Sequence, residues 1–76
     1  MKEFLEYALK LIVDNPKDLN IEENVLGETS VNFIIHAKSE DIGKIIGKEG
    51  KIIQALRNLL KILAVKENKQ VHLEVV

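Results

Sequence analysis

The apolar residues at the start of the chain recur at the spacing of one helix face. Charged residues stand between them, and the i, i+3, i+4 pattern is followed by Phe4, Leu5, Ala8, Leu9 and Ile12. This pattern predicts an amphipathic helix over residues 2–14. The helix should end at Asp14-Asn15-Pro16, because proline disfavours helical backbone angles in the residue before it.

Alternation of apolar and polar residues predicts three strands. A short strand begins near Leu19 and runs to residue 22, before a turn at Leu26-Gly27-Glu28. Residues 29–37 alternate more strongly and predict a half-buried strand that also carries Ile34 on its outer face. Its buried face should hold Val31, Phe33, Ile35 and Ala37. Residues 71–75 alternate again and predict a final strand.

Two helices are predicted between the second and third strands. Ser39 is a good N-cap for a short helix over residues 40–46, which Gly47 should end. A longer helix should run over residues 51–65, with polar residues opposite an apolar stripe of Ile52, Ile53, Leu56, Leu59, Leu60 and Leu63. The order of elements is therefore helix, strand, strand, helix, helix, strand.

This order predicts an α+β fold with a three-stranded mixed sheet and three helices packed on one face. The first two strands can pair as a hairpin, while the last strand returns after a two-helix crossover and should lie parallel to the second. A chain of 76 residues should form one domain, residues 1–76, near the lower size limit for a single core without staples.

Composition narrows the class of protein. The chain is 46% hydrophobic and 30% charged and has no Cys, which indicates a folded domain suited to a reducing compartment. The start at Met1 lacks the features of an export signal, and no apolar run approaches the roughly 20 residues that span a bilayer. We therefore expect a cytoplasmic protein with no membrane partner.

Charge is distributed unevenly along the chain. The net charge is −1 overall, but it is −4 over residues 1–37, +3 over residues 38–61 and zero over residues 62–76. An anionic partner should therefore meet the middle of the chain, although such a run of charge is more often only solvated surface.

The middle of the chain also contains two glycines three residues apart, in Gly47-Lys48-Glu49-Gly50. This segment can turn sharply, and it ends where the longer helix begins, so the free N–H groups of that helix could hold a phosphate. Lys48 and Lys51 add positive charge at the same place. By itself the pattern is weak, because a helix C-cap followed by a tight turn explains it equally well.

Catalytic and cofactor sites find no support in the sequence. His36 and His72 fall on separate strands and there is no Cys, so neither a Cys-His pair nor a typical zinc site can form. The Walker spacing is absent, and Gly43 and Gly47 do not follow a strand as a dinucleotide fingerprint requires. We expect no enzyme activity, no cofactor, no metal and no small-molecule substrate.

In its context the glycine loop resembles that of the KH domain. Residues 45–53 fit the pattern Ile-Ile-Gly-x-x-Gly-x-x-Ile, and the order of elements matches the type II KH arrangement, αββααβ. With its N-terminal Lys-Glu helix, its Asp-Asn-Pro stop and the segment Lys66-Glu67-Asn68-Lys69, nearly the whole chain resembles the small, single-domain bacterial KH proteins of the KhpA family.

This resemblance implies an RNA-binding protein whose loop grips about four nucleotides of single-stranded RNA. Positive charge around the Gly47–Gly50 clamp would come from Lys44 and Lys51, apolar surface from Ile46, and Arg57 would face either the same groove or solvent. Of Ile42, Ile46 and Ile53, at least two should pack in the core instead. The family further implies a homodimer, or pairing with a larger KH-containing protein, in RNA regulation or chaperoning.

The alternative is a KH-fold interaction module that does not bind nucleic acid. The net charge and the carboxylate of Glu49 inside the loop favour this alternative, while the lysines that flank the loop oppose it. The longer helix also carries Ala55, Ile62, Ala64 and Val65 outside its stripe, so its apolar surface is wider than one sheet face needs. That surface suits a dimer contact, or else the helix is buried on two sides within one chain.

Overall fold

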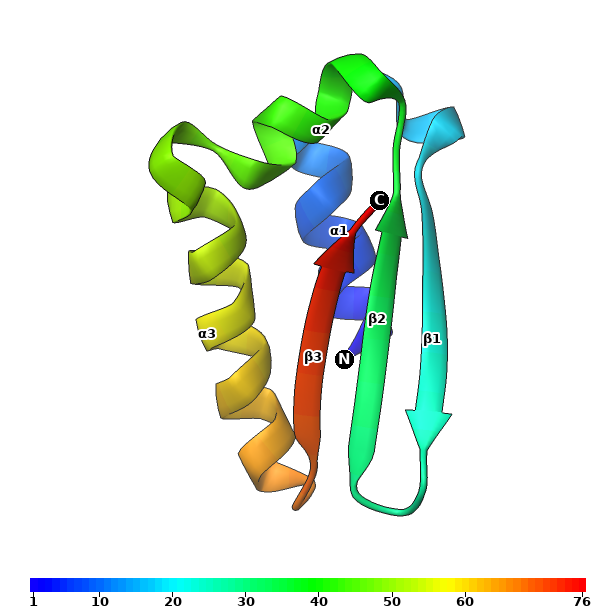
Figure 1. Ribbon diagram of the computed structural model, residues 1–76, viewed down its shortest axis with the longest axis vertical. Coiled ribbons are helices and arrows are strands. Elements are labelled where there is room, and N and C mark those ends of the chain that lie inside the picture. Colours follow the sequence, from blue (N-terminus) through cyan, green and yellow to red (C-terminus); the bar gives the residue numbers. More distant parts are fainter.

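The computed structural model describes residues 1–76 and contains one three-stranded sheet in the order β1-β2-β3 (Figure 1). Strand β1 (Asn20–Leu26) pairs antiparallel with β2 (Ser30–His36), and β3 (Gln70–Val75) pairs parallel with β2. The hairpin and the parallel return predicted from the sequence are both confirmed. Since β2 is central, β3 keeps one edge free.

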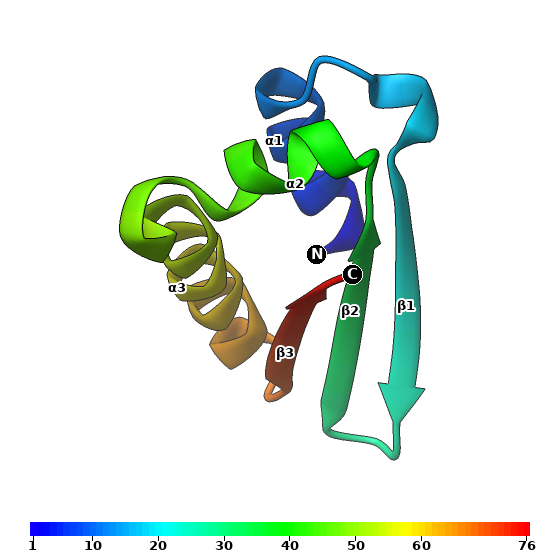
Figure 2. The ribbon, with the colours of Figure 1, turned by 45° about the horizontal axis from the view of Figure 1, so that its top comes forward.

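The three helices cover one face of this sheet (Figures 1 and 2). Helix α1 is Lys2–Ile12, α2 is Ser39–Ile46 and α3 is Lys51–Lys66. The last of these lies beside β3, while α2 crosses one end of the sheet and joins α3 through a short loop (Figure 2). The α+β arrangement of the type II KH fold is confirmed. None of the helices combines the length and the apolar character that crossing a bilayer demands.

The core lies between the helices and the inner face of the sheet. Fourteen buried apolar residues form it, and the side chains of Leu5, Leu9, Phe33, Ile35, Ile45 and Leu60 are completely buried. As predicted, Val31, Phe33 and Ile35 share the buried face of β2, but Ala37 lies after the end of the strand and is half-buried. Burial of this apolar surface is the main term that stabilises the fold.

The first two elements differ in length from the prediction. Helix α1 ends at Ile12, two residues early, because Val13 is already extended with φ −82° and ψ 152°. Strand β1 is longer than expected and pairs with β2 along its whole length, from Asn20 opposite His36 to Leu26 opposite Ser30. Pairing with a neighbouring strand therefore outweighs the weak alternation of residues 23–26.

The helices around the loop also differ in detail. Ser39 is the first helical residue of α2 and not its N-cap, since Lys38 takes that position and no side chain caps the helix. In α3 the buried stripe is narrower than predicted. Ile52 and Leu59 are 38% and 47% exposed, and the buried positions are Ile53, Leu56, Leu60 and Ala64. One side of α3 is enough to cover the sheet, so the helix is not buried on two sides.

Asp41 is the one charged residue that is completely buried. Its carboxylate accepts hydrogen bonds from the backbone N–H groups of Asp14 at 3.2 Å and Asn15 at 3.0 Å, and from Nδ2 of Asn15 at 3.1 Å. The same amide also donates to Glu40 at 2.7 Å. These bonds tie the first turn of α2 to the segment that follows α1. Asp41 therefore joins two segments of the chain, in addition to placing a negative charge at a helix N-terminus.

We expect Asp41→Ala to lower the free energy of unfolding by about 2–4 kcal/mol, because it leaves buried N–H groups without an acceptor. Urea unfolding followed by circular dichroism measures the loss. Glu23→Ala, which removes an exposed carboxylate from β1, is the control and should change stability by less than about 0.5 kcal/mol. Equal losses in the two variants would contradict the role assigned to Asp41.

Candidate nucleic-acid interface

The loop between α2 and α3 is built from left-handed backbone. Gly47 ends α2, and its N–H donates to the carbonyl of Gly43 at 2.9 Å. Lys48–Gly50 then form a single tight turn in which the N–H of Gly50 donates to the carbonyl of Gly47 at 3.2 Å. Positive φ values occur at Gly47 (76°), Glu49 (57°) and Gly50 (73°). The predicted sharp turn is confirmed, and glycine occupies two of its three left-handed positions.

Gly47 is required by space as well as by backbone angles. A Cβ at this position would lie 2.5 Å from Cγ1 of Ile52, which is closer than two non-bonded carbon atoms can approach. Its ψ of 177° with a φ of 76° also falls in a region that only glycine adopts readily. At Gly50 no atom lies within 4 Å of an added Cβ, so only the positive φ favours glycine there. The loop backbone therefore rests directly on Ile52.

The loop leads into an uncapped helix N-terminus. Gly50 is the N-cap of α3, no side chain caps that end, and the first turn contains no acidic residue. Unpaired N–H groups and the positive end of the helix dipole attract anions. Lys48 and Lys51 are exposed at the same place, and Glu49 is exposed between them. At this place the main-chain N–H groups and the ammonium groups of Lys48 and Lys51 attract an anion, and only the carboxylate of Glu49 repels it.

Apolar side chains, but no aromatic ones, lie beside the loop. Ile46 and Ile52 are 37% and 38% exposed, whereas Ile53 is buried and Ile42 is half-buried. At least two of Ile42, Ile46 and Ile53 were expected in the core, but only Ile53 belongs to it. The aromatic residues lie elsewhere, with Phe33 in the core and Phe4 and Tyr7 on α1. Any base held here would meet aliphatic surface.

Two of the predicted site residues are engaged away from the loop. The ammonium group of Lys44, in the last turn of α2, forms an ion pair with the carboxylate of Asp14. Arg57 donates from Nη2 to the backbone carbonyl of Leu73 in β3 at 3.2 Å, and this contact is partly buried. Arg57 thus lies between α3 and the edge strand. The loop itself brings together Ile46 and Gly47–Lys51.

Sequence reasoning missed the support that Ile52 gives to the loop, because it placed this residue in the buried stripe. The one available signal was its position two residues after Gly50, but only the path of the backbone shows that Gly47 lies over it. The two histidines are on separate strands, where His36 Nε2 lies 3.7 Å from Oε1 of Glu22. No group of His, Asp and Glu side chains is placed to hold a metal ion.

The comparison with protein families agrees with this geometry. The family model described as "KhpA/KhpB, KH domain" matches residues 2–75. The chain therefore belongs to the KhpA/KhpB family of KH-domain proteins.

Curated relatives match over their full length or nearly so. The RNA-binding protein KhpA of Clostridium perfringens is 45% identical over 76 residues, and that of Clostridium acetobutylicum is 43% identical, each covering 100% of both chains. The RNA-binding protein KhpA of Chlamydia trachomatis is 44% identical over 75 residues, which are 99% of this chain and 95% of the relative. No solved structure gives a significant match.

The three glycines around the loop should respond differently to alanine. Gly47→Ala should destabilise the fold by about 2–4 kcal/mol, because it adds a clash with Ile52 to an unfavourable backbone conformation. Gly50→Ala should cost about 1–2 kcal/mol, because only its backbone angles are unfavourable. Gly43→Ala, in the interior of α2 with open space around it, should stabilise by about 0.5–1 kcal/mol. Urea unfolding of the three variants measures this order, which a flexible or differently folded loop would not produce.

Proposed function

We propose that this protein binds single-stranded RNA through one KH module. The observation that carries this proposal is the loop Gly47–Gly50, whose bare backbone leads into the uncapped N-terminus of α3 in a chain of the KhpA/KhpB family. KH domains use such a loop to clamp the backbone of about four nucleotides. The names of the curated relatives, RNA-binding protein KhpA, support the same ligand.

Each part of the loop has a physical role in this proposal. Phosphate oxygens accept hydrogen bonds from main-chain N–H groups at the start of α3, and the exposed ammonium groups of Lys48 and Lys51 compensate their charge. Unstacked bases rest on the exposed parts of Ile46 and Ile52. These contacts are to the RNA backbone and to base faces, so they discriminate little between sequences.

The affinity of one module should be modest. Stacking on an aromatic side chain is worth about 1–3 kcal/mol per base, and no aromatic residue lies at the loop. The carboxylate of Glu49 repels phosphate. Lys44 and Arg57 add charge only if they are released from Asp14 and Leu73, which hold them in the free protein. If one or both of them join Lys48 and Lys51, so that three or four phosphates are neutralised, log K should fall with log salt at a slope of about −2 to −3.

A second copy would raise this affinity, and α3 has a surface suited to it. Leu59 and Ile62 are 47% and 60% exposed on the side of α3 that does not face the sheet. We propose that this surface joins two copies of the chain, or one copy to a larger KH-containing protein. Two weak sites on one RNA can gain on the order of 10²–10⁴ in avidity. Such an assembly suits a role in RNA regulation or chaperoning in the bacterial cytoplasm.

The same surface favours a second candidate function, an interaction module that binds no RNA. The net charge of −1 and Glu49 agree with this alternative. The two candidate functions differ in one measurable respect. If the protein binds no RNA, substitutions in the loop have no effect on RNA affinity.

RNA binding is tested by Lys48→Asp with Glu49→Asp. We expect the wild-type protein to bind a fluorescent single-stranded RNA at low salt and the double variant to lose at least about tenfold in affinity, because a phosphate contact is replaced by repulsion. Lys17→Asp with Asp18→Glu makes the same change of charge at an exposed pair far from the loop and should bind like wild type. If the loop variant also binds like wild type, the RNA does not lie on this loop.

Dimer formation is tested by Leu59→Glu. Sedimentation of the wild-type protein at high concentration should give twice the chain mass of 8.6 kDa, and the variant should sediment as a monomer because a charge in the contact is costly to desolvate. Val25→Glu, at an exposed apolar position of β1, is the control and should remain dimeric. A wild-type protein that sediments only at 8.6 kDa would contradict the homodimer.

A further inference from the structure

Helix α3 is positively charged along its whole length. It contains four basic residues and no acidic residue in 16 positions. Arg57 and Lys61 stand four positions apart and therefore share one side of the helix. The contact of Arg57 with Leu73 shows that this side faces the edge of β3. Positive charge thus continues beyond the loop, and the rise of a helix places Lys61 about 15 Å from Lys51 along α3.

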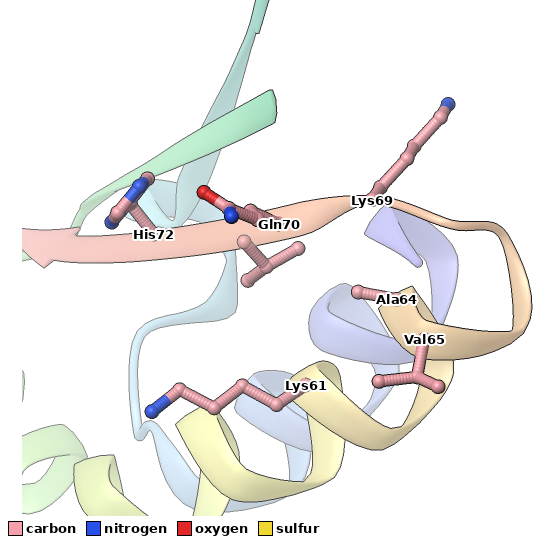
Figure 3. A pocket seen from close by; sticks show the side chains of 7 residues that line it. Lys61, Ala64, Val65, Lys69, Gln70 and His72 are labelled. Atoms are coloured by element: carbon pink, nitrogen blue, oxygen red, sulfur yellow. The ribbon is translucent and has the colours of Figure 1, made fainter. Parts of the chain in front are cut away.

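A cavity of about 340 Å³ lies at the far end of this charged side, between the last turns of α3 and the start of β3 (Figure 3). Ala64 and Val65 from the helix and Val71 from the strand provide its apolar lining. The volume is at the lower end of the range for ligand pockets, which suits one nucleotide better than a larger molecule.

The polar groups around the cavity are donors or neutral groups, and no carboxylate lines it. The lining is completed by Lys61, Lys69, Gln70 and His72. In Figure 3 Gln70 and His72 project from the face of β3 that is turned away from α3, Lys61 extends from the helix, and Lys69 points away from α3. Glu67 follows α3 in the chain, and Glu28 precedes Thr29, whose backbone carbonyl accepts a hydrogen bond from the N–H of Gln70, but neither acidic residue is part of the lining.

We propose that this cavity is a second nucleotide subsite for the RNA strand held at the loop. The inference rests on the proposed function and extends the bound strand beyond four nucleotides. Lys61 and Lys69 at the rim compensate phosphate charge, and the apolar lining of Ala64, Val65 and Val71 covers one face of a base. The charge of the lining favours an anionic occupant over a second copy of this chain.

The helix geometry keeps this subsite separate from the proposed dimer surface. Successive residues of an α-helix are about 100° apart, so Leu59 and Lys61 point in nearly opposite directions. Leu59 lies on the exposed apolar side, and Lys61 lies on the side of the cavity. A dimer and a longer bound RNA are therefore compatible.

The test is a series of single-stranded RNAs of four, six, eight and ten nucleotides, titrated at fixed low salt. Wild-type affinity should rise beyond four nucleotides. Lys61→Gln with Lys69→Gln should weaken the ten-nucleotide RNA about five- to twentyfold, with a salt slope lower by about 1.4, and change the four-nucleotide RNA less than about twofold. Gln70→Glu, of nearly the same shape, should show the same dependence on length.

Lys10→Gln with Lys17→Gln removes the same charge from the N-terminal part of the chain and is the matched control, which should leave both RNAs unaffected. Circular dichroism confirms the fold of every variant. An affinity that stops rising at four nucleotides, or equal losses on short and long RNAs, would overturn the subsite. A cavity that binds uridine monophosphate, detected by amide shifts at Gln70 and His72, without any effect of RNA length would be a site for free nucleotides and would also overturn it.

Failure of the subsite is distinguishable from failure of the loop. If the Lys48→Asp with Glu49→Asp variant binds all RNA lengths like wild type, the loop proposal fails, and with it the continuous strand. If that variant loses binding at every length while Lys61→Gln with Lys69→Gln does not, only the subsite fails.

Discussion

The contact between the backbone of Gly47 and the side chain of Ile52 determines how α2 and α3 meet. No side chain fits at Gly47, so the chain can turn directly over the first residues of α3. Because of this close turn, the N-terminus of α3 opens next to Lys48 and Lys51, and no side chain caps it. The open helix N-terminus that we propose as the RNA site is therefore a consequence of one packing constraint as much as of charge.

The other end of α2 is held by a buried carboxylate. The carboxylate of Asp41 accepts three hydrogen bonds from N–H groups of Asp14 and Asn15 in place of water. These bonds hold the segment after α1 against the first turn of α2. Lys44 reaches the same segment through its ion pair with Asp14. A short helix of eight residues has little stability of its own. Asp41 at its first turn and the contact of Gly47 with Ile52 at its end therefore fix the direction in which it presents the loop.

The sides of α3 have different physical characters. Its inner side is apolar and packs on the sheet, the side toward β3 carries Arg57 and Lys61, and Leu59 and Ile62 make an exposed apolar surface. The narrow buried stripe makes this separation possible, because a helix that covers one sheet flank leaves most of its circumference free. In our proposal one helix thus serves the core, an RNA strand and a protein partner without overlap.

Periodicity and turn residues were enough to determine the order of the elements, the pairing of the strands and the position of the loop, because these depend on local backbone preferences and on the short distances between neighbouring segments. The glycine spacing with its flanking isoleucines also located the candidate site and its family. Burial at Asp41, exposure at Ile52 and Leu59, and the partners of Lys44 and Arg57 were decided by the tertiary structure alone. Each of these depends on which residues from distant segments of the chain come into contact. A local sequence pattern does not predict such contacts.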